Sequence, residues 1–535
     1  MPSSESAHTD TFCRDNLPAR ELWPELLPVP GCDYPTRLNA ATELLRYGTD
    51  AGLDRTALVS PSETWTYGQL LDRSAQVARV LADTVGLQPG NRVLVRAPNN
   101  PWTVAVWLAV LRAGGVVVLT MPMLRRRELV ELCELVHPVI AVCDGRLLDE
   151  LPEGMRLLTI GDGPDDLPAL AAVMSTTFED VQTAADDIAL LAPTSGTTGR
   201  PKVTMHGHRD VLAIADTFSR HVLQPRSDDV FATSAPLAFT FGLGCGVIFP
   251  MSVGAAAFLV EKATPSELAD LVAEHGITVL ATAPTGYRAM LADGKSPRLR
   301  GVRRLISAGE ALPKATWEAV HEATGIKLID GIGATEMLHI FIASADDDIR
   351  PGSTGRPVPG YVATTLDEDG IELAHGLPGR LAVKGPTGCR YLSGDRQDVY
   401  VQNGWNITGD TYIRDEDGWF WYQARSDDMI VSSGYNIAGP EVELAVLECA
   451  EVLECAVVGL PDTERGQRVT AFVVPVPGVV PDNQLALRIQ EHVKATLAPY
   501  KYPRTVHFLD ALPRTGSGKL QRYRLRVDAV AVQTT

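Results

Sequence analysis

Apolar residues in the first part of the chain follow two different spacings. Between residues 70 and 81 they recur at helical spacing, which predicts a helix with one buried face. Residues 92–95 and 116–119 are short apolar runs typical of buried strands, and the segment 102–112 between them has the pattern of a helix. This strand–helix–strand order predicts a largely parallel sheet flanked by helices.

The pattern changes twice farther along the chain. A second region of strands and helices is predicted over 187–343, and from about 344 to 425 short alternating runs between Gly and Pro turns predict a small β-rich subdomain. Later strand and helix patterns predict an α+β lid. We therefore predict an α/β fold with an N-terminal domain over 1–426, which holds two αβ subdomains and the β-rich one, and a mobile C-terminal lid domain over 427–535.

One long segment, residues 230–260, has no charged side chain and therefore raises the question of a membrane span. Several Gly residues and Pro250 interrupt it, and such residues divide an apolar run into shorter elements. We expect a buried, glycine-rich helix that ends near Pro250, followed by a buried strand over 255–260, and no membrane partner.

Composition narrows the class of protein. A chain of 535 residues is too long for one core and should divide into two or three domains. The formal net charge of −18 argues against nonspecific binding to nucleic acid or to an anionic membrane. The eight cysteines show no C-x-x-C spacing, and the first residues lack the basic start and apolar core of a signal peptide, so we expect a cytoplasmic protein with reduced thiols.

A loop of small hydroxyl and glycine residues runs from Thr194 to Lys202, after a predicted strand and before a predicted helix. Backbone N–H groups, hydroxyls and a cation together can hold phosphate oxygens. The common phosphate loop has four residues between its glycines and a Gly before its Lys, whereas Gly196 and Gly199 are separated by two residues and Pro201 precedes Lys202. On its own, the loop also fits a surface turn.

Four further motifs follow this loop in a fixed order. They are Asp330-Gly-Ile-Gly-Ala-Thr-Glu336, Thr408-Gly-Asp410, the segment from Arg425 to Gly434, and Pro513-Arg-Thr-Gly-Ser-Gly-Lys519-Leu-Gln-Arg522. The ordered set resembles the adenylate-forming superfamily of acyl-CoA and aryl-CoA synthetases, peptide-synthetase adenylation domains and firefly luciferase. The resemblance covers roughly the whole chain and implies an enzyme that activates a carboxylate with ATP as an acyl adenylate.

The resemblance also implies an ATP site with three parts. The phosphates would contact Thr194, Ser195, Gly196, Thr197, Thr198, Gly199 and Lys202. The adenine would lie against Gly309, Glu310, Ala311, Asp330, Gly331 and Ile332. Asp410 would accept from the ribose hydroxyls and Arg425 would reach the nucleotide, which suits the chemistry of a carboxylate and a guanidinium. The family has an aromatic residue where Ile332 stands, but Ile can still pack against a base.

Three residues are expected to carry the chemistry, again by resemblance. Attack of a carboxylate on ATP brings two anions together, so positive charge at both ends of the reaction lowers the barrier. Lys519 would bridge the substrate carboxylate and the α-phosphate, and Thr335 would touch phosphate. Glu336 would help to hold Mg²⁺, which would neutralise the departing pyrophosphate. A solvated loop lysine is the plain alternative for Lys519.

The lid is expected to swing about Asp427 as a hinge, which would withdraw Lys519 after the first step. Gly434, with Ser433 beside it, would then border a tunnel for the pantetheine arm of coenzyme A, because a missing side chain leaves room. Lys519 is also a plausible acylation target for an acyltransferase or a lysine-acetylating regulator. The sequence leaves open whether the chain is a monomer or a homodimer.

The acid pocket is expected near Phe239, Thr240 and Phe241, where aromatic walls suit a planar ring. By resemblance to the benzoate-CoA and anthranilate (2-aminobenzoate)-CoA ligase branch, Gly333 and His339 complete it, and we favour anthranilate over benzoate. For each Phe, packing in the protein core is as good an interpretation as a place in the acid pocket. For His339, a structural role is nearly as good an interpretation as a role in that pocket. The pair His206-x-His208 has the spacing of metal ligands but no third ligand cluster, so we set it aside.

The sequence therefore predicts an ATP-dependent, AMP-forming aryl-CoA ligase whose small-molecule partners are an aromatic acid, ATP and coenzyme A. A first rival is a stand-alone enzyme that loads a carrier protein; the end of the chain soon after Lys519 favours free coenzyme A. A second rival is an ATPase or kinase that uses the loop at 194–202, but the missing G-K-[ST] sequence speaks against it.

Overall fold

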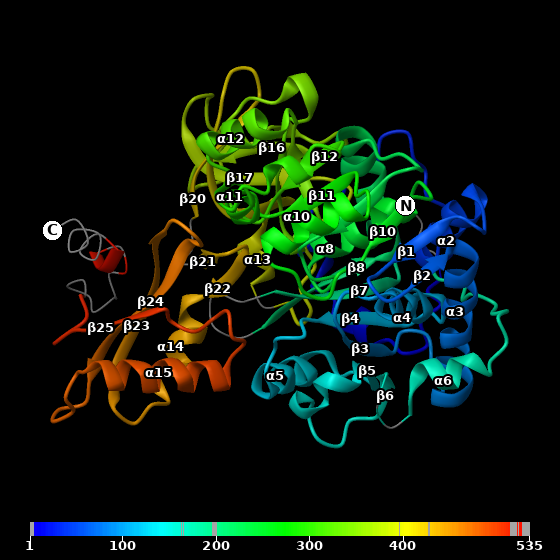
Figure 1. The fold of residues 1–535 in the computed structure, drawn as a ribbon, viewed down its shortest axis with the longest axis horizontal. Coiled ribbons are helices and arrows are strands. Elements are labelled where there is room, and N and C mark those ends of the chain that lie inside the picture. Colours follow the sequence, from blue (N-terminus) through cyan, green and yellow to red (C-terminus); the bar gives the residue numbers. More distant parts are fainter. Residues whose placement is uncertain are drawn as a thin grey trace.

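The computed structural model describes residues 5–161, 163, 165–194, 201–394, 396–425, 429–513, 522 and 524–526. Within these ranges the strands form four sheets, three in a large N-terminal part and one in a smaller C-terminal part (Figure 1). The predicted α/β class is therefore confirmed. The predicted boundary at 426/427 falls outside the described residues and stays a prediction.

A six-stranded sheet forms the first layer of the large part. Its order is β6 (Leu157–Ile160), β5 (Ile140–Asp144), β3 (Arg92–Arg96), β4 (Val116–Thr120), β7 (Ile188–Thr194) and β8 (Lys202–Gly207). The first five strands run parallel, and β8 pairs antiparallel to β7. The apolar runs predicted as strands lie in β3 and β4, and the predicted helix between them is α4 (Pro101–Arg112).

Helices that flank this sheet bury an apolar face, as the spacing of apolar residues at 70–81 predicts. They include α3 (Tyr67–Arg79), which the π-helix η2 (Val80–Val85) extends, α5 (Arg126–Val136) and α6 (Leu167–Ala172). A capping box closes the start of α3, where Thr66 accepts from the Gln69 N–H and the Gln69 side chain accepts from the Thr66 N–H. Such caps satisfy helix N–H groups that have no partner within the helix.

A nine-stranded sheet forms the second layer. Its order is β15 (Arg356–Pro357), β14 (Ile340–Ala343), β13 (Ile329–Gly333), β12 (Arg304–Ser307), β11 (Val279–Thr282), β9 (Val230–Thr233), β10 (Ala256–Phe258), β1 (Thr56–Val59) and β2 (Thr64–Thr66). The strands from β13 to β1 in this order are parallel. Their carboxyl ends meet at one edge, which is where open α/β sheets bind ligands.

Helices of the second region cover this sheet and join the two layers. They are α2 (Ala40–Ala51), α7 (His208–Ile214) with η4 (Ala215–Leu223), α10 (Pro265–Glu274), α11 (Pro284–Ala292) and α12 (Lys314–Thr324). The uncharged segment 230–260 forms β9, a helical run from α8 (Thr240–Leu243) through η5 (Gly244–Ile248) to α9 (Phe249–Met251), and β10. This matches the expected helix and strand. Among the described residues, no helix is long and apolar enough to cross a membrane.

An antiparallel sheet of five strands forms the predicted β-rich region. It consists of β16 (Val362–Leu366), β17 (Pro378–Lys384), β19 (Trp405–Arg414), β18 (Val401–Gln402) and β20 (Phe420–Arg425). The remaining short helices are α1 (Phe12–Asp15), η1 (Arg20–Leu22), η3 (Gly145–Glu150), η6 (Ser296–Leu299), η7 (Thr335–Met337), η8 (Asp346–Asp348) and α13 (Gln397–Tyr400).

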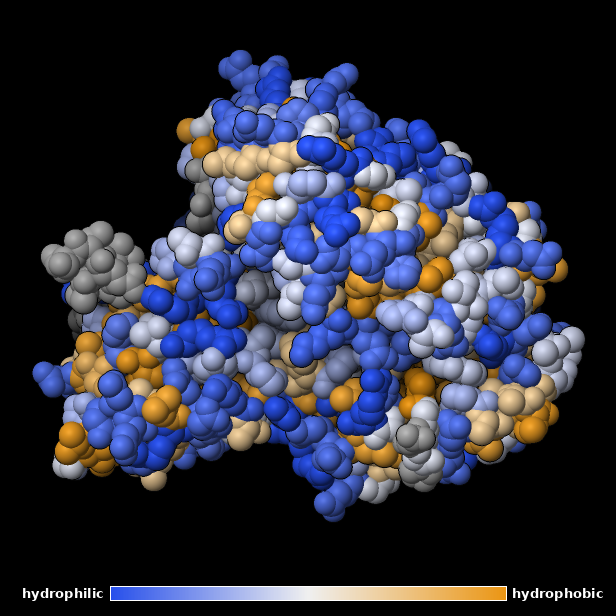
Figure 2. Space-filling view, in the orientation of Figure 1, coloured by the Kyte–Doolittle hydropathy of each residue, from blue (hydrophilic) through white to orange (hydrophobic). Residues whose placement is uncertain are grey.

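The C-terminal part is an α+β unit with its own core. Its sheet is formed by β22 (Tyr435–Ala438), β21 (Met429–Ser432), β24 (Gly466–Pro475), β23 (Val452–Asp462) and β25 (Thr505–Phe508). The helices α14 (Gly439–Leu447) and α15 (Asn483–Thr496) pack on it in an apolar cluster that includes Val457 and Val493. Figure 2 shows that the surface is hollowed where this unit meets the large part.

Candidate functional site

A cavity of about 470 Å³ opens at the carboxyl ends of the parallel strands of the nine-stranded sheet. The segment after β9 with α8, the ends of β11, β12 and β13, and a hairpin of the C-terminal part line it, together with residues of α10 and α11. Its lining includes Ser234, Pro236, Phe239, Thr240, Phe241, Thr282, Ala308, Gly309, Gly333, Ala334, Thr335, His339, Ser433, Gly434, Tyr435 and Glu464. A concave site of this size, mostly apolar with a few polar groups, is typical of small-molecule binding.

The predicted phosphate loop joins two strands. Thr194 pairs with Lys202 across the antiparallel strands β7 and β8, so strand β8 separates the loop from helix α7. The prediction that a helix follows the loop directly is therefore wrong, although the alternation of Val203 and Met205 with Thr204 and His206 is typical of a strand. Five of the predicted phosphate contacts, Ser195, Gly196, Thr197, Thr198 and Gly199, lie outside the described residues.

The end of β13 carries the two residues that were predicted to meet phosphate and metal. The Thr335 carbonyl lies 2.8 Å from Nε2 of His206, a fully buried ring that also lies 3.0 Å from Thr204 Oγ1. Burial lowers the pKa of His206 to about 3, so this imidazole is neutral at ordinary pH. His206 thus fixes the turn that holds Thr335. It does not share a site with His208, whose Nδ1 accepts from the Ala40 N–H.

Glu336 is held by a residue that the sequence analysis missed. The Tyr391 hydroxyl, which is nearly buried, donates to Glu336 Oε1 at 2.6 Å, and the Lys202 ammonium lies 5.6 Å from the centre of the Tyr391 ring. Mg²⁺ is commonly bound by one or two carboxylates together with substrate phosphates and waters. A single oriented carboxylate beside a predicted phosphate loop therefore fits a magnesium ion that arrives with ATP.

Asp330 has the environment of an acceptor for a buried ligand. Burial raises the pKa of its carboxyl to about 7. The Ser307 hydroxyl and the Gly331 N–H lie near this carboxyl and offset part of that rise in pKa, but no described residue completes a hydrogen bond to the buried Oδ1 atom. A buried polar atom without a partner is costly, so such an atom suits a ligand donor such as the amino group of adenine. Gly331 and Ile332 follow it in β13, and Ile332 packs against the main core.

The other residues that were predicted to contact the nucleotide differ from one another in their surroundings. Gly309 lines the cavity, whereas the Glu310 carboxylate accepts from the N–H and hydroxyl of Thr285 and from the N–H of Gly434, and Ala311 is exposed. Asp410 is nearly buried in β19 and faces Arg425 of β20 in the register of that sheet. The prediction that these residues bind the nucleotide remains open for Glu310, Ala311, Asp410 and Arg425.

The other end of the cavity is aromatic. His339 is 2% exposed, and its ring centre lies 4.6 Å from that of Phe249, 5.5 Å from that of Phe218 and 5.7 Å from that of Phe241. Burial lowers the pKa of His339 to about 3, so the ring is neutral. Gly244 makes room for it, because a Cβ there would lie 2.4 Å from His339 Cδ2. A planar, neutral ring would fit beside these side chains.

Phe239 and Phe241 both line the cavity, but they do so on different sides. Phe239 precedes helix α8, which begins at Thr240, and Phe241 lies within it. The Phe241 ring packs toward His339, whereas the Phe239 ring lies 6.1 Å from that of Tyr435. Thr240 and Gly333 also line the cavity. That these residues form an acid pocket stays a prediction.

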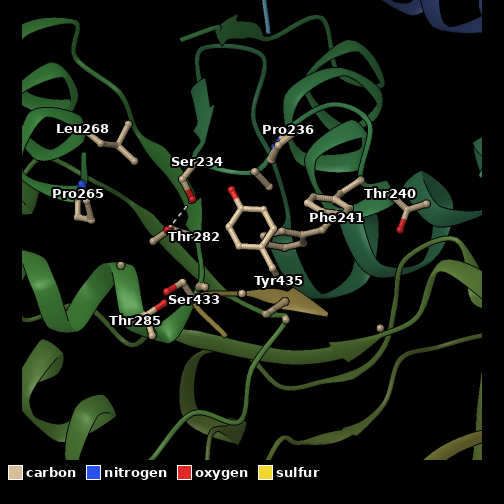
Figure 3. Close-up of a pocket in the computed structure, with 18 of the residues that line it drawn as sticks. Ser234, Pro236, Thr240, Phe241, Pro265, Leu268, Thr282, Thr285, Ser433 and Tyr435 are labelled. Carbon is tan, nitrogen blue, oxygen red and sulfur yellow. Dashed lines mark hydrogen bonds between the residues drawn. The ribbon is translucent and has the colours of Figure 1, made fainter. Parts of the chain in front are cut away.

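The C-terminal part contributes a tight hairpin. Ser433 and Gly434 join β21 to β22 and both have positive φ, +51° and +80°, as a two-residue hairpin turn of this hand requires. In Figure 3 the Tyr435 ring, directly after the turn, reaches into the pocket between Phe241 and the hydrogen-bonded pair Ser234 and Thr282. Tyr435 and Glu464 were not predicted from the sequence.

Two key predictions, Lys519 and the hinge Asp427, lie outside the described residues. Leu512 and Leu525, which flank Lys519 in sequence, pack in one apolar cluster with Val458 and Phe472 of the C-terminal sheet. The basic run Arg125-Arg-Arg127 forms ion pairs with Glu150, Glu153 and Glu448.

Sequence comparison agrees with this geometry. The profile of the AMP-binding enzyme family matches residues 47–391, and the profile of the AMP-binding enzyme C-terminal domain matches 441–519. The chain belongs to the AMP-binding enzyme family. The first match covers most of the large part, and the second covers the smaller part from residue 441, just after the hairpin.

Individual relatives of this AMP-binding enzyme cover nearly its whole length. A benzoate–CoA ligase of Thauera aromatica is 36% identical over 93% of this chain and 97% of its own. The crystal structure of an anthranilate CoA ligase in complex with anthranoyl-AMP superposes with a TM-score of 0.72 at 33% identity, over 94% of this chain and 99% of the other. A benzoate CoA ligase from Burkholderia xenovorans LB400 gives 0.69 at 33% identity, over 91% and 99%.

Proposed function

We propose that this AMP-binding enzyme is an ATP-dependent aryl-CoA ligase. One observation carries the proposal: a single cavity joins an aromatic end at Phe241 and His339, the strand ends at Gly309 and Thr335, and the hairpin at Ser433–Tyr435. These three regions suit an aromatic acid, a nucleotide and the arm of a thiol. The similarity to benzoate- and anthranilate-CoA ligases over nearly the whole chain supports the same reaction.

The reaction has two steps. In the first, a carboxylate oxygen of the aromatic acid attacks the α-phosphorus of ATP, the bond between the α-phosphorus and its bridging oxygen to the β-phosphate breaks, and pyrophosphate leaves. In the second, the sulfur of coenzyme A attacks the carbonyl carbon of the aryl adenylate, the thiol loses its proton, and the C–O bond breaks as AMP leaves. Lys519 is proposed to bridge the acid and the α-phosphate in the first step.

The described residues have defined tasks in this scheme. Lys202 would contact phosphate at the mouth of the β7–β8 loop, and Thr335, whose backbone His206 holds, would contact phosphate at the end of β13. Glu336, oriented by Tyr391, would hold Mg²⁺, which when bound would neutralise charge on the departing pyrophosphate. Asp330 would accept from the adenine amino group through its buried oxygen.

The acid is proposed to be of benzoate size. Rings enclose the end of the cavity at His339, and the imidazole there is uncharged, so the site suits an unsubstituted benzene ring better than a charged chain. Benzoate is therefore the first candidate. Anthranilate is the second, because the polar imidazole of His339 could interact with a ring amino group and because an anthranilate CoA ligase is among the similar structures.

The decisive experiment supplies Mg-ATP and a panel of benzoate, hydroxybenzoates, anthranilate and short aliphatic acids, with and without coenzyme A. AMP, pyrophosphate and thioester are followed by mass spectrometry. We expect thioester from benzoate or anthranilate, and loss of at least about a hundredfold in the adenylation rate in Lys519→Ala, since a cation that stabilises developing charge contributes several kcal/mol.

Three results would contradict parts of the proposal. An adenylate that coenzyme A cannot discharge would identify a carrier protein as the acceptor. Release of inorganic phosphate instead of AMP and pyrophosphate would indicate an ATPase or kinase. Reaction of aliphatic acids alone would refute the aromatic pocket while the adenylation chemistry survives.

A further inference from the structure

A buried ion pair ties the C-terminal part to the large part at a point outside the cavity. Lys501, in the segment between α15 and β25, donates to Glu128 Oε1 of helix α5 at 2.5 Å, and the Ala498 N–H donates to Glu128 Oε2 at 2.9 Å. Lys501 and Glu128 are 5% and 8% exposed. The two residues are far apart in sequence, so the pair exists only because the two parts are docked in this way.

Because this ion pair is buried, removing one of its partners should cost more free energy than breaking a salt bridge at the surface. Lys501 also donates to Glu441 Oε1 at 2.7 Å, within the C-terminal part, so one ammonium separates two carboxylates. Breaking a buried pair by removing one partner leaves an uncompensated charge and is costly, whereas exposed pairs contribute little. Arg127 and Glu448 form another ion pair between the two parts. Both of these side chains are exposed, so this pair should contribute little to docking.

A chain of contacts leads from this ion pair to the cavity. Tyr500 precedes Lys501, and its ring stacks on that of Tyr435 with centres 4.2 Å apart. Tyr435 in turn lines the cavity and lies near Phe239. The neighbouring turn is anchored separately, because the Gly434 N–H donates to the Glu310 carboxylate of the large part. The docked position of Lys501 therefore fixes where the hairpin meets the cavity.

The docked arrangement favours one of the two steps. The hairpin at Ser433–Tyr435 closes the cavity where the thiol arm is expected to enter. Leu512 and Leu525, on either side of Lys519 in sequence, belong to a different apolar cluster on the C-terminal sheet, and β25, which leads toward Leu512, runs along the outer side of the C-terminal part in Figure 1. Residues expected for the second step thus lie at the cavity in the arrangement that contains the Glu128–Lys501 pair.

We propose that Glu128 is a positioning residue for the second step: by binding Lys501, it holds the C-terminal part where the hairpin completes the thiol entrance, and it has no role in forming the adenylate. This inference rests on the proposed two-step function. It predicts that the charge of Glu128 matters for transfer to the thiol and not for the exchange of pyrophosphate with ATP.

The test uses the full chain carrying Glu128→Gln. Glutamine keeps an oxygen to accept from the Arg125 N–H that caps α5, and the pair of Lys501 with Glu441 remains, so both parts should stay folded. Two rates are measured for the best acid of the panel: pyrophosphate–ATP exchange without coenzyme A, and thioester formation with it. We expect thioester formation to fall by about tenfold or more, because the cost of a broken buried pair weakens docking, and exchange to change by less than about twofold.

Two controls separate docking from general damage. Glu134→Gln changes an exposed carboxylate of the same helix and should leave both rates unaltered. Lys501→Met breaks the pairs with both Glu128 and Glu441, so it should lower thioester formation at least as much as Glu128→Gln. Adding Glu128→Gln to Lys501→Met should cause no further loss, since the Glu128–Lys501 pair is already broken. Equal loss of both rates, or an unaltered thioester rate in Glu128→Gln, would overturn the proposal.

A structural measurement keeps this inference separate from the proposed function. Hydrogen exchange of the amides in 429–438 is recorded in the wild-type chain and in Glu128→Gln, without substrates. We expect faster exchange in the variant, since weaker docking exposes the hairpin to water. Unchanged exchange would refute the docking role even if the enzyme proved to use a carrier protein instead of coenzyme A.

Discussion

Replacing Gly244 by Ala should damage binding of the acid while leaving the nucleotide site intact. Gly244 lies in the helical run after α8, and an added Cβ would lie 2.4 Å from His339 Cδ2, 2.5 Å from Nε2 and 3.1 Å from Phe249 Cζ. Contacts this short require the imidazole to move. Because Phe218 and Phe249 pack on the same ring, the open direction for it is the cavity beside Phe241.

The expected size of the effect follows from the cost of overpacking. Forcing a methyl group into a packed site costs about 1–3 kcal/mol. At about 1.4 kcal/mol per factor of ten, this corresponds to a loss of roughly 5- to 150-fold in kcat/KM for the aromatic acid. Ala is favoured over Gly inside a helix by about 0.8–1.0 kcal/mol, so the melting temperature should fall by less than the packing cost alone implies.

Steady-state kinetics with the best acid and with ATP varied in turn test this prediction. The KM for ATP should stay within about twofold of wild type, since no residue near Asp330 moves. Gly301→Ala is a suitable control because a Cβ there meets no atom within 4 Å. If Gly244→Ala kept a wild-type kcat/KM for the acid, His339 would not form a wall of the acid site, and the aromatic end of the cavity would have to be reassigned.

Two further predictions concern the nucleotide end. Tyr391→Phe removes the donor to Glu336, and since hydrogen bonds to charged groups contribute about 1.5–3 kcal/mol, we expect at least about tenfold weaker Mg-ATP binding by calorimetry, with an unaltered fold by circular dichroism. Asp330→Asn should change how stability depends on pH: the folded pKa of about 7 lies above the unfolded value, so the wild-type carboxyl contributes stability at low pH that is lost as pH rises toward 7. The unfolding free energy of the Asn variant relative to wild type should therefore increase between about pH 4 and pH 7 in urea titrations, and a pH-independent difference would contradict the burial of Asp330.

The sequence predicted those features that depend on local patterns. The strands at 92–95 and 116–119, the helix between them and the helix-then-strand order of 230–260 all follow from spacing of apolar residues, because these elements are buried in the way that their periodicity implies. The family followed from the order of short motifs, which requires no knowledge of how they pack.

The remaining features depend on contacts between residues distant in sequence. Tyr391 orients Glu336 across a separation of 55 residues, and Lys501 meets Glu128 across 373, and neither pair has a local signature. Strand β8 had one, in the alternation of apolar and polar residues after Lys202, but its polar members Thr204 and His206 are buried as well and bond to backbone groups. An alternating pattern predicts a strand with one exposed polar face, and β8 does not fit this expectation because both of its faces are buried.

Both the large part and the C-terminal part contribute residues to the cavity, and this affects how the selectivities of the enzyme can evolve. Ser433, Tyr435 and Glu464 come from the C-terminal part, whereas His339, Phe241 and Thr335 come from the large part. The acid end and the thiol entrance that we propose are therefore encoded in separate lengths of chain. We expect that grafting the C-terminal part of a relative with another acceptor would alter which thiol is used and leave the preferred ring as it was, so that the two selectivities can evolve independently.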